Sequence, residues 1–448
     1  IPYAKPPVGE LRFAKPEAIK TPLKDIIDGT KTTYACIQPN FPYFKDYIGN
    51  LSQSEDCLVL NIWTQNAGND STGGTVALKP VMFWMHGGAL SIGSSYQRTP
   101  YYNWFNGTAL ASHDVVVVTI NYRLGPFGFT YGGDNTAPGN AGFYDQLLAL
   151  KWVRDNIHSF GGERDQITIF GHSAGSWSVS AHLLSPLSRG LFQRAIMQSG
   201  ALLGDKKRSI VTKAEALTAA KQMAAQLNCT SDDNQWLQCL RSVDTNLIRD
   251  VTKETTFTIE EGTEFLPELA INAFNAHHFN PDVDLIAGVS RRDGSNLAVS
   301  TIPQLAGNLT KDIFKFLVLG VSEAFHDIDG QAVVDYYLKG VDTGNSDALK
   351  AAFYDFFGDV LMKCPTYLFA RQYAKHSANS RVYFYEQSYQ SRNAHLWGCV
   401  GPAMGVCHGA EEEFVFGVPL VYPNTFTATD VGFARYVTKM WTDFAKTG

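Results

Sequence analysis

The chain has 448 residues, which at about 150 residues per domain allows roughly three domains, although α/β sheets often continue for longer as one. Its 45% hydrophobic and 18% charged residues, with 39 glycines and 19 prolines that follow no period, exclude disordered, collagen-like and coiled-coil proteins. The net charge of -6 offers no basic surface to a phosphate backbone, which excludes nucleic acid as a partner. No apolar run reaches the roughly 18 residues that a membrane span needs, so no transmembrane segment is predicted.

Short apolar runs alternate with longer amphipathic ones, which predicts an α/β protein with a mostly parallel, doubly wound sheet flanked by helices. The runs at residues 81–85 and 115–120 are typical of strands that helices bury on both faces. Apolar residues between 143 and 157 recur at steps of three and four, which predicts a helix that Gly161 and Gly162 end. Also predicted are strands at 166–170, 194–197, 284–289 and 381–385, helical excursions beside the sheet within 205–280, and a final helix over 431–444.

A GxSxG motif occupies residues 171–175, directly after one predicted strand and before a helix-like segment. The motif alone is weak, but a strand, a sharp turn and a helix around it are the setting of a nucleophilic serine. Such a turn places the hydroxyl at the helix N-terminus. We therefore predict Ser173 as a nucleophile, and the alternative is a turn serine that caps the helix.

Acyl transfer also needs hydrogen-bond donors for an oxyanion, and His86-Gly87-Gly88-Ala89 follows the first predicted strand. Small residues there allow backbone N–H groups to approach a substrate. The predicted donors are Gly88, Ala89 and Ala174, with Gly87 permitting the turn, and the alternative is an ordinary glycine turn. We expect His86 to order this loop rather than to act as a base.

Eight longer segments follow one another along the chain. They are IPYAKPPVGELRF, SEDCLVLNIW, FWMHGGA, NYRLGPFGF, GNAGFYDQLLALKWVRDNI, FGGERDQITIFGHSAG, AIMQSG and VCHGAEEEFVFG. In this order they resemble the type-B carboxylesterase and cholinesterase family of α/β-hydrolases. The resemblance implies a single α/β-hydrolase domain over residues 1–448, with an active site at the base of a deep gorge. We expect this domain to be incomplete at both ends.

In this fold the acid and then the histidine follow the serine along the chain. Each of the eleven histidines has an ordinary structural alternative, but His408 in GVCHG matches the family's histidine loop. Asp293 follows a predicted strand 115 residues before His408, a spacing close to the family's. The family most often has Glu there, so the reach of Asp293 is open, and a surface salt bridge with Arg291 and Arg292 is the alternative. Ser199 resembles the family's serine beside the acid.

Seven cysteines include no CxxC pair, so no zinc knuckle is indicated and no metal site is predicted. The predicted disulfides are Cys36 with Cys57, Cys229 with Cys239, and Cys399 with Cys407. The first two are implied by the resemblance, whereas we suggest the third because its cysteines bracket a Gly-rich segment beside the predicted catalytic histidine. Cys364 resembles a cysteine whose usual partner lies in a C-terminal tail.

The expected location is extracellular or within the secretory pathway. Five Asn-x-Ser/Thr triplets, at Asn50, Asn69, Asn106, Asn228 and Asn308, add weak support for a secreted glycoprotein. The sequence does not indicate an oligomeric state.

The predicted activity is hydrolysis of a small-molecule carboxylic ester through an acyl-enzyme, without metal or organic cofactor. The alternatives are a catalytically silent adhesion or recognition module and a cholinesterase. The cholinesterase pattern has a Trp in the first disulfide loop, Glu before the nucleophile and Phe after the acid. This chain instead has Phe and Tyr in that loop, with Tyr47 as the partial substitute, then His172, and then Asn296 with Leu297. We therefore predict a preference for uncharged esters, since quaternary ammonium groups bind to aromatic faces.

Overall fold

The computed structural model describes residues 1–21, 26–29, 34–39, 52–65, 77–96, 102–203, 210–230, 235–255, 257, 259–324 and 328–448. In these residues seven strands form one sheet in the order β1-β3-β2-β4-β5-β8-β9, and each neighbouring pair is parallel except β1 with β3. The strands are β1 Leu60–Trp63, β2 Lys79–Met85, β3 Val116–Ile120, β4 Gly162–His172, β5 Arg194–Gln198, β8 Asp284–Ser290 and β9 Val382–Gln387. The predicted α/β class with a mostly parallel sheet is confirmed.

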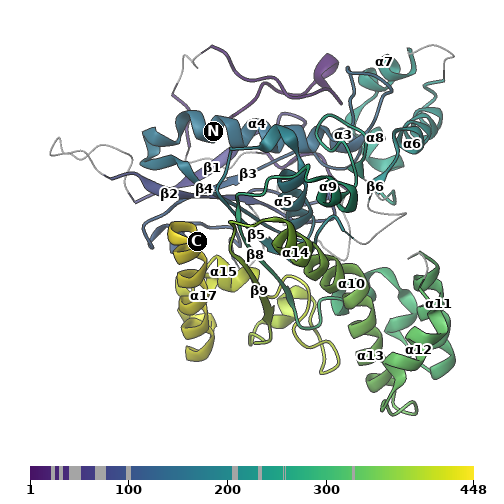
Figure 1. The fold of residues 1–448 in the computed structure, drawn as a ribbon. Helices are drawn as coiled ribbons and strands as arrows, with labels where there is room; N and C mark the ends of the chain where they lie inside the picture. Colours follow the sequence, from purple (N-terminus) through teal and green to yellow (C-terminus); the bar gives the residue numbers. More distant parts are fainter. Residues whose placement is uncertain are drawn as a thin grey trace.

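Helices cover both faces of the sheet, so this part of the molecule has three layers (Figure 1). Along β2, Val81, Phe83 and Met85 enter one hydrophobic core and Met82 and Trp84 enter the other, because successive strand side chains point to opposite faces. The first core is closed by α4 Ala141–Asn156, α5 Ala174–Leu184, α9 Ala270–Ala276 and α14 Cys364–His376. The second is closed by α2 Thr108–Ala111, α15 Glu412–Val415, α16 Val418–Val421 and α17 Ala428–Thr447.

Two further groups of helices lie beside this sandwich. The first group contains α6 Lys213–Gln226, α7 Gln235–Ser242 and α8 Thr245–Val251, which pack on Phe13 and on Phe127 of α3 Gly125–Phe129. The second contains α10 Ser295–Thr301, α11 Lys311–Ala324, α12 Gly330–Leu338 and α13 Ser346–Gly358, at the lower right of Figure 1. Each group packs around its own apolar cluster, which is separate from the two cores on the faces of the sheet.

The predicted elements agree closely with those of the structure. The helix predicted over 143–157 is α4, and Gly161 follows it with φ 77° in the left-handed region that favours glycine. The stretch 205–280 contains α6 to α9 in its described residues, as expected. It also contains a separate two-stranded sheet, β6 Ile210–Val211 with β7 Ile259–Glu260, whose strands are too short for a periodic pattern.

Buried ion pairs and disulfides connect segments that are distant in the sequence. Nη2 of Arg12 lies 2.5 Å from Oε1 of Glu55. Nη2 of Arg123 lies 2.7 Å from Oδ1 of Asp145, and the side chains of this second pair are almost fully buried. The described disulfides are Cys36–Cys57, Cys229–Cys239 and Cys399–Cys407, with Cα–Cα distances of 5.0, 5.5 and 5.9 Å, so the three predicted pairs are confirmed. The thiol of Cys364 is free and exposed. Among the described helices, none is both long and apolar enough to cross a membrane.

Candidate active site

Ser173 lies in a sharp turn between the end of β4 and the start of α5. Its backbone has φ 56° and ψ -121°, a strained conformation for a residue with a side chain. The turn fits only because its neighbours are glycines: a Cβ on Gly175 would lie 2.0 Å from the carbonyl oxygen of Met85. The Ser173 side chain makes no capping hydrogen bond to α5, so the alternative of a helix-capping serine has no support.

The glycine loop after β2 lies directly against this turn. A Cβ on Gly87 would lie 3.1 Å from the Cβ of Ser173, and Gly88 has φ 108°. Within the described part of the chain, no backbone acceptor bonds the N–H groups of Gly88, Ala89 or Ala174. The loop that contains the predicted oxyanion donors therefore packs against the serine at Gly87, and the donors have no backbone partner in these residues.

His86, the first residue of this loop, packs in the interior and contacts the loop backbone. Its ring is buried and stacks on Tyr122 at 4.4 Å between ring centroids, and its Nδ1 lies 2.8 Å from the carbonyl oxygen of Gly87. The Tyr122 hydroxyl donates a 2.7 Å hydrogen bond to the His86 carbonyl oxygen. Burial lowers the pKa of His86 to about 4, so this histidine is neutral at pH 7 and packs as a structural residue.

Asp293 and His408 meet in the interior. Nδ1 of His408 lies 2.7 Å from Oδ1 of Asp293, so the shorter aspartate side chain does reach the ring. The other carboxylate oxygen, Oδ2, accepts hydrogen bonds from the Ser199 hydroxyl at 2.7 Å and from the Ser290 N–H at 2.9 Å. Asp293 is only 1% exposed, and its neighbour Arg292 pairs with Asp355 at 3.0 Å. The surface salt bridge considered as an alternative is therefore absent from these described residues.

Asn296, in the first turn of α10, holds the backbone of His408 by both edges of its amide. Its Oδ1 accepts a hydrogen bond from the His408 N–H at 3.2 Å, and its Nδ2 donates to the His408 carbonyl oxygen at 2.9 Å. Nδ2 also donates to the carbonyl oxygen of Trp397 at 3.1 Å. In the sequence Asn296 marks only the absence of an aromatic residue, and its bonds to the His408 backbone leave no sequence signal.

No hydrogen bond joins Ser173 to His408 in the described residues. Nε2 of His408 is buried and has no hydrogen-bond partner among the described residues. The two residues are only 9% and 8% exposed.

His172, directly before Ser173, lies in a second buried cluster. Its Nδ1 is 2.8 Å from Oε1 of Glu412, and its Nε2 is 3.7 Å from Oε1 of Glu411. Its ring centroid lies 4.2 Å from that of His408. Burial alone lowers the pKa of His172, but Glu412 and Glu411 outweigh burial and raise the pKa to about 9.

The comparisons with known proteins agree with this geometry. Residues 1–448 match the model described as the carboxylesterase family. The chain belongs to the carboxylesterase family. It is 34% identical over 472 residues to an acetylcholinesterase of Bungarus fasciatus, 33% over 503 residues to one of Danio rerio, and 33% over 482 residues to acetylcholinesterase-1 of Trittame loki. These alignments include 100% of this chain and 74%, 76% and 81% of the three relatives.

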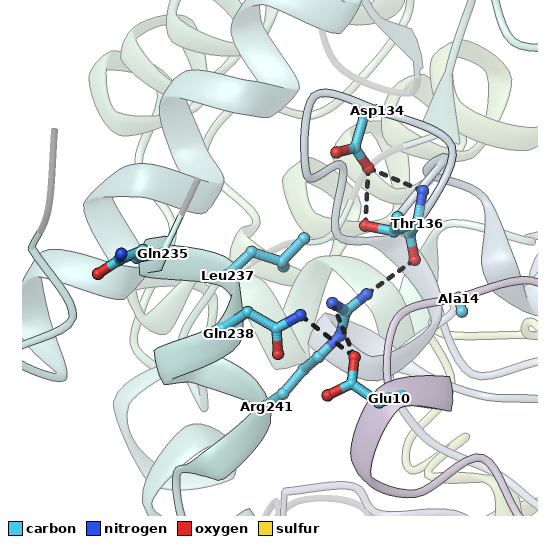
Figure 2. Close-up of a pocket in the computed structure, with 8 residues that line it drawn as sticks. All are labelled: Glu10, Ala14, Asp134, Thr136, Gln235, Leu237, Gln238 and Arg241. Atoms are coloured by element: carbon cyan, nitrogen blue, oxygen red, sulfur yellow. Dashed lines mark hydrogen bonds and ion pairs between the residues drawn. The ribbon is translucent and has the colours of Figure 1, made fainter. Parts of the chain in front are cut away.

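A separate hollow in this carboxylesterase-family chain is unrelated to the site. It measures about 510 Å³ and lies beside α7, and Ser173 and His408 are not among the described residues that line it (Figure 2). Figure 2 shows its polar side chains bonded to one another: Arg241 donates to the Thr136 carbonyl oxygen at 3.0 Å, and Gln238 donates to Glu10 at 3.2 Å. A polar ligand would have to break these bonds.

Some features of the sequence analysis lie outside the described residues. They are Tyr47, which belongs to the first disulfide loop, and the triplets at Asn50 and Asn69. In the described residues, no group of three or more His, Cys, Asp and Glu side chains is arranged to hold a metal ion. The contact of His172 with Glu411 and Glu412 was not predicted from the sequence. The sequence signal for this contact was three consecutive glutamates shortly after His408 and a histidine directly before Ser173.

Proposed function

We propose that this carboxylesterase-family chain is a serine carboxylic ester hydrolase in which Ser173 is the nucleophile, His408 the base and Asp293 the residue that orients the base. The supporting observation is the 2.7 Å contact between Asp293 Oδ1 and His408 Nδ1. A carboxylate accepts only, so it keeps the ring proton on Nδ1 and leaves a lone pair on Nε2. Nε2 is then in the protonation state that a general base requires.

In the acylation step, Ser173 Oγ attacks the ester carbonyl carbon while Nε2 of His408 takes the hydroxyl proton. The carbonyl oxygen becomes an oxyanion, which the N–H groups of Gly88, Ala89 and Ala174 stabilise by hydrogen bonds. The C–O bond to the alcohol then breaks, and the proton on Nε2 moves to the departing alkoxide. The products of this step are a free alcohol and an acyl ester on Ser173.

Deacylation repeats the same proton transfers with water. Nε2 of His408 takes a proton from the attacking water, and the same donors stabilise the second oxyanion. The bond to Ser173 Oγ breaks, Oγ regains the proton from Nε2, and the carboxylic acid leaves. Through both steps Asp293 stays ionised and stabilises the transient imidazolium, and Ser199 and Ser290 fix the carboxylate in place.

The silent-module alternative is less well supported. A protein that only recognises a partner has no physical need for a strained serine, a buried carboxylate beside a histidine and a loop of unbonded N–H groups together. Each of these features costs stability, and together they serve acyl transfer. The experiment is treatment with a phosphonylating ester analogue followed by mass spectrometry of the digested protein. We expect one adduct, on Ser173; no adduct, or an adduct on another serine, would favour the silent module.

For the substrate we propose uncharged esters over choline esters. Asn296, where the cholinesterase pattern has an aromatic residue, uses its amide to hold the His408 backbone and offers no ring to a quaternary ammonium group. His172 replaces an acidic residue directly before the nucleophile, and its raised pKa makes that position cationic at pH 7. The test compares kcat/KM for a choline ester with that for its uncharged dimethylbutyl isostere. A preference above about tenfold for the cation, or about 1.4 kcal/mol, would overturn the proposal.

We also propose that the chain works in an oxidising compartment, in the secretory pathway or outside the cell. Its three disulfides support this location, because such bonds persist where thiols are not kept reduced. Detection of the protein with its disulfides intact in the medium of expressing cells would test the proposal.

A further inference from the structure

The buried pair of His172 and Glu412 is the feature of this site that the catalytic scheme does not use. The two side chains are 4% and 0% exposed, and 2.8 Å separates Nδ1 from Oε1. A charge removed from water this completely is destabilising unless an opposite charge or hydrogen bonds compensate for it. His172 and Glu412 therefore depend on each other for their ionised forms.

Glu411 extends this pair toward the predicted acid. Its Oε1 lies 3.7 Å from Nε2 of His172, and its Oε2 accepts a 3.1 Å hydrogen bond from the Ser290 hydroxyl. The N–H of the same Ser290 donates to Asp293. One residue at the end of β8 thus holds both the carboxylate that serves His408 and a carboxylate that serves His172.

The two imidazole rings are in direct contact. Their centroids are 4.2 Å apart with an angle of 43° between the planes. A cation at this distance opposes a second positive charge on His408, because both side chains are buried and solvent screens the repulsion weakly. The charged groups around the two rings are Glu411, Glu412 and Asp293. Tyr385 of β9 interacts with Glu411 and Asp293, and burial raises its pKa so far that it stays neutral.

We propose that Glu412 and Glu411 keep His172 as an imidazolium, and that this buried cation, in contact with the ring of His408, opposes protonation of that ring. His172 is thus a positioning residue that sets the working pH of the base, an inference that rests on the proposed function of His408. It touches no reacting atom. The arrangement accounts for a cationic residue directly before the nucleophile together with two glutamates, Glu411 and Glu412, shortly after the base.

The direct test is 15N NMR of the full chain labelled at histidine. An imidazolium carries N–H protons on both ring nitrogens, whereas a neutral ring carries one. We expect the His172 signals, assigned from their loss in His172→Gln, to remain those of an imidazolium at pH 7.5. A neutral His172 at that pH would overturn the proposal, and this measurement needs no turnover.

The second measurement follows the pKa of His408 in variants. In His172→Gln the cation is absent and Glu412 remains, so we expect the pKa of His408 to rise by about one unit or more, a tenfold change in its proton affinity. The acidic limb of kcat/KM should move upward by the same amount. The double variant His172→Gln with Glu412→Gln removes both charges together and should show a smaller rise. This variant also replaces the single one if an unpaired Glu412 prevents folding.

The control is His182→Gln in α5. His182 is also a buried histidine, but its Nδ1 lies 2.7 Å from the Ser188 hydroxyl and burial lowers its pKa to about 3, so it is neutral. We expect this variant to leave the pKa of His408 unchanged. If His172→Gln behaves like His182→Gln, the proposal is wrong. If the protein hydrolyses no ester but the NMR pKa of His408 still rises in His172→Gln, the electrostatic inference holds and the proposed function fails.

Discussion

Replacement of Asp293 by Asn tests the proposed site most sharply, because the structure dictates which way the new amide must point. Oδ2 of Asp293 accepts from the Ser290 N–H and from the Ser199 hydroxyl. The backbone N–H can only donate, so the oxygen of the amide must take the Oδ2 position. The NH2 group is then forced toward Nδ1 of His408, at the place where Oδ1 now lies 2.7 Å away.

This orientation inverts the tautomer of the histidine. Because an NH2 group donates, Nδ1 of His408 must accept, and the ring proton moves to Nε2. Nε2 then has no lone pair for the Ser173 proton. We expect kcat/KM for a p-nitrophenyl ester to fall by about 10³- to 10⁴-fold at neutral pH, or about 4 to 5.5 kcal/mol of transition-state stabilisation. Thermal unfolding should change little, since the two side chains have nearly the same shape.

Two further variants complete this test. Asp293→Glu keeps a carboxylate acceptor for Nδ1 of His408, so it should retain activity within about tenfold of the parent. The added methylene should lower the free energy of unfolding by about 1–3 kcal/mol. Ser199→Ala combined with Asp293→Asn should not restore activity, because the Ser290 N–H still fixes the amide. If Asp293→Asn alone stays within tenfold of the parent, the reasoning is refuted and another carboxylate serves His408.

Three other predictions follow from the structure. Asn296→Ala removes two hydrogen bonds to the backbone of His408, the proposed base, and one to the carbonyl oxygen of Trp397. We expect the free energy of unfolding in denaturant to fall by about 2 kcal/mol and kcat to fall tenfold to hundredfold, and unchanged turnover would contradict the positioning role. Burial raises the pKa of Glu260 and of Glu413 to about 8, so each carboxyl binds its proton more tightly in the folded protein than in the unfolded one. This proton binding adds fully to the free energy of unfolding below the unfolded pKa near 4.5, and the contribution is lost as pH rises to and through about 8. The Tm measured by calorimetry should therefore fall as pH rises from about 4.5 to about 8, level off above that, and fall less in Glu260→Gln, whereas a rising Tm would refute the assignment. Replacing Cys399 and Cys407 by Ser opens a loop with a sequence separation of 8 and should lower the free energy of unfolding by about 2–3 kcal/mol, and an unaltered denaturation midpoint would count against a stabilising bridge.

Much of the fold could be predicted because it is written in local patterns. The continuous apolar runs that form β2 and β3 can be satisfied only where both faces of a strand are buried, and the helical spacing of α4 leaves one apolar side. The turn at Ser173 could also be predicted, since its conformation requires glycines at fixed offsets from the serine. Asp293 and His408 required the resemblance as well, because an aspartate and a histidine 115 residues apart carry no signal of contact on their own.

The remaining features depend on packing between distant segments. Asn296 bonds the backbone of His408, 112 positions along the chain, only because the loop after β8 and the histidine loop meet at one edge of the sheet. In the sequence, His172 is only a departure from the cholinesterase pattern and Glu412 is one of three consecutive glutamates. Their contact exists because the end of β4 and the start of α15 lie together in the fold. Sequence determines which side chains are available and what local backbone they favour. Whether a carboxylate faces an imidazole at 2.8 Å without water is decided by tertiary structure, because burial and charge pairing are properties of the packed neighbourhood.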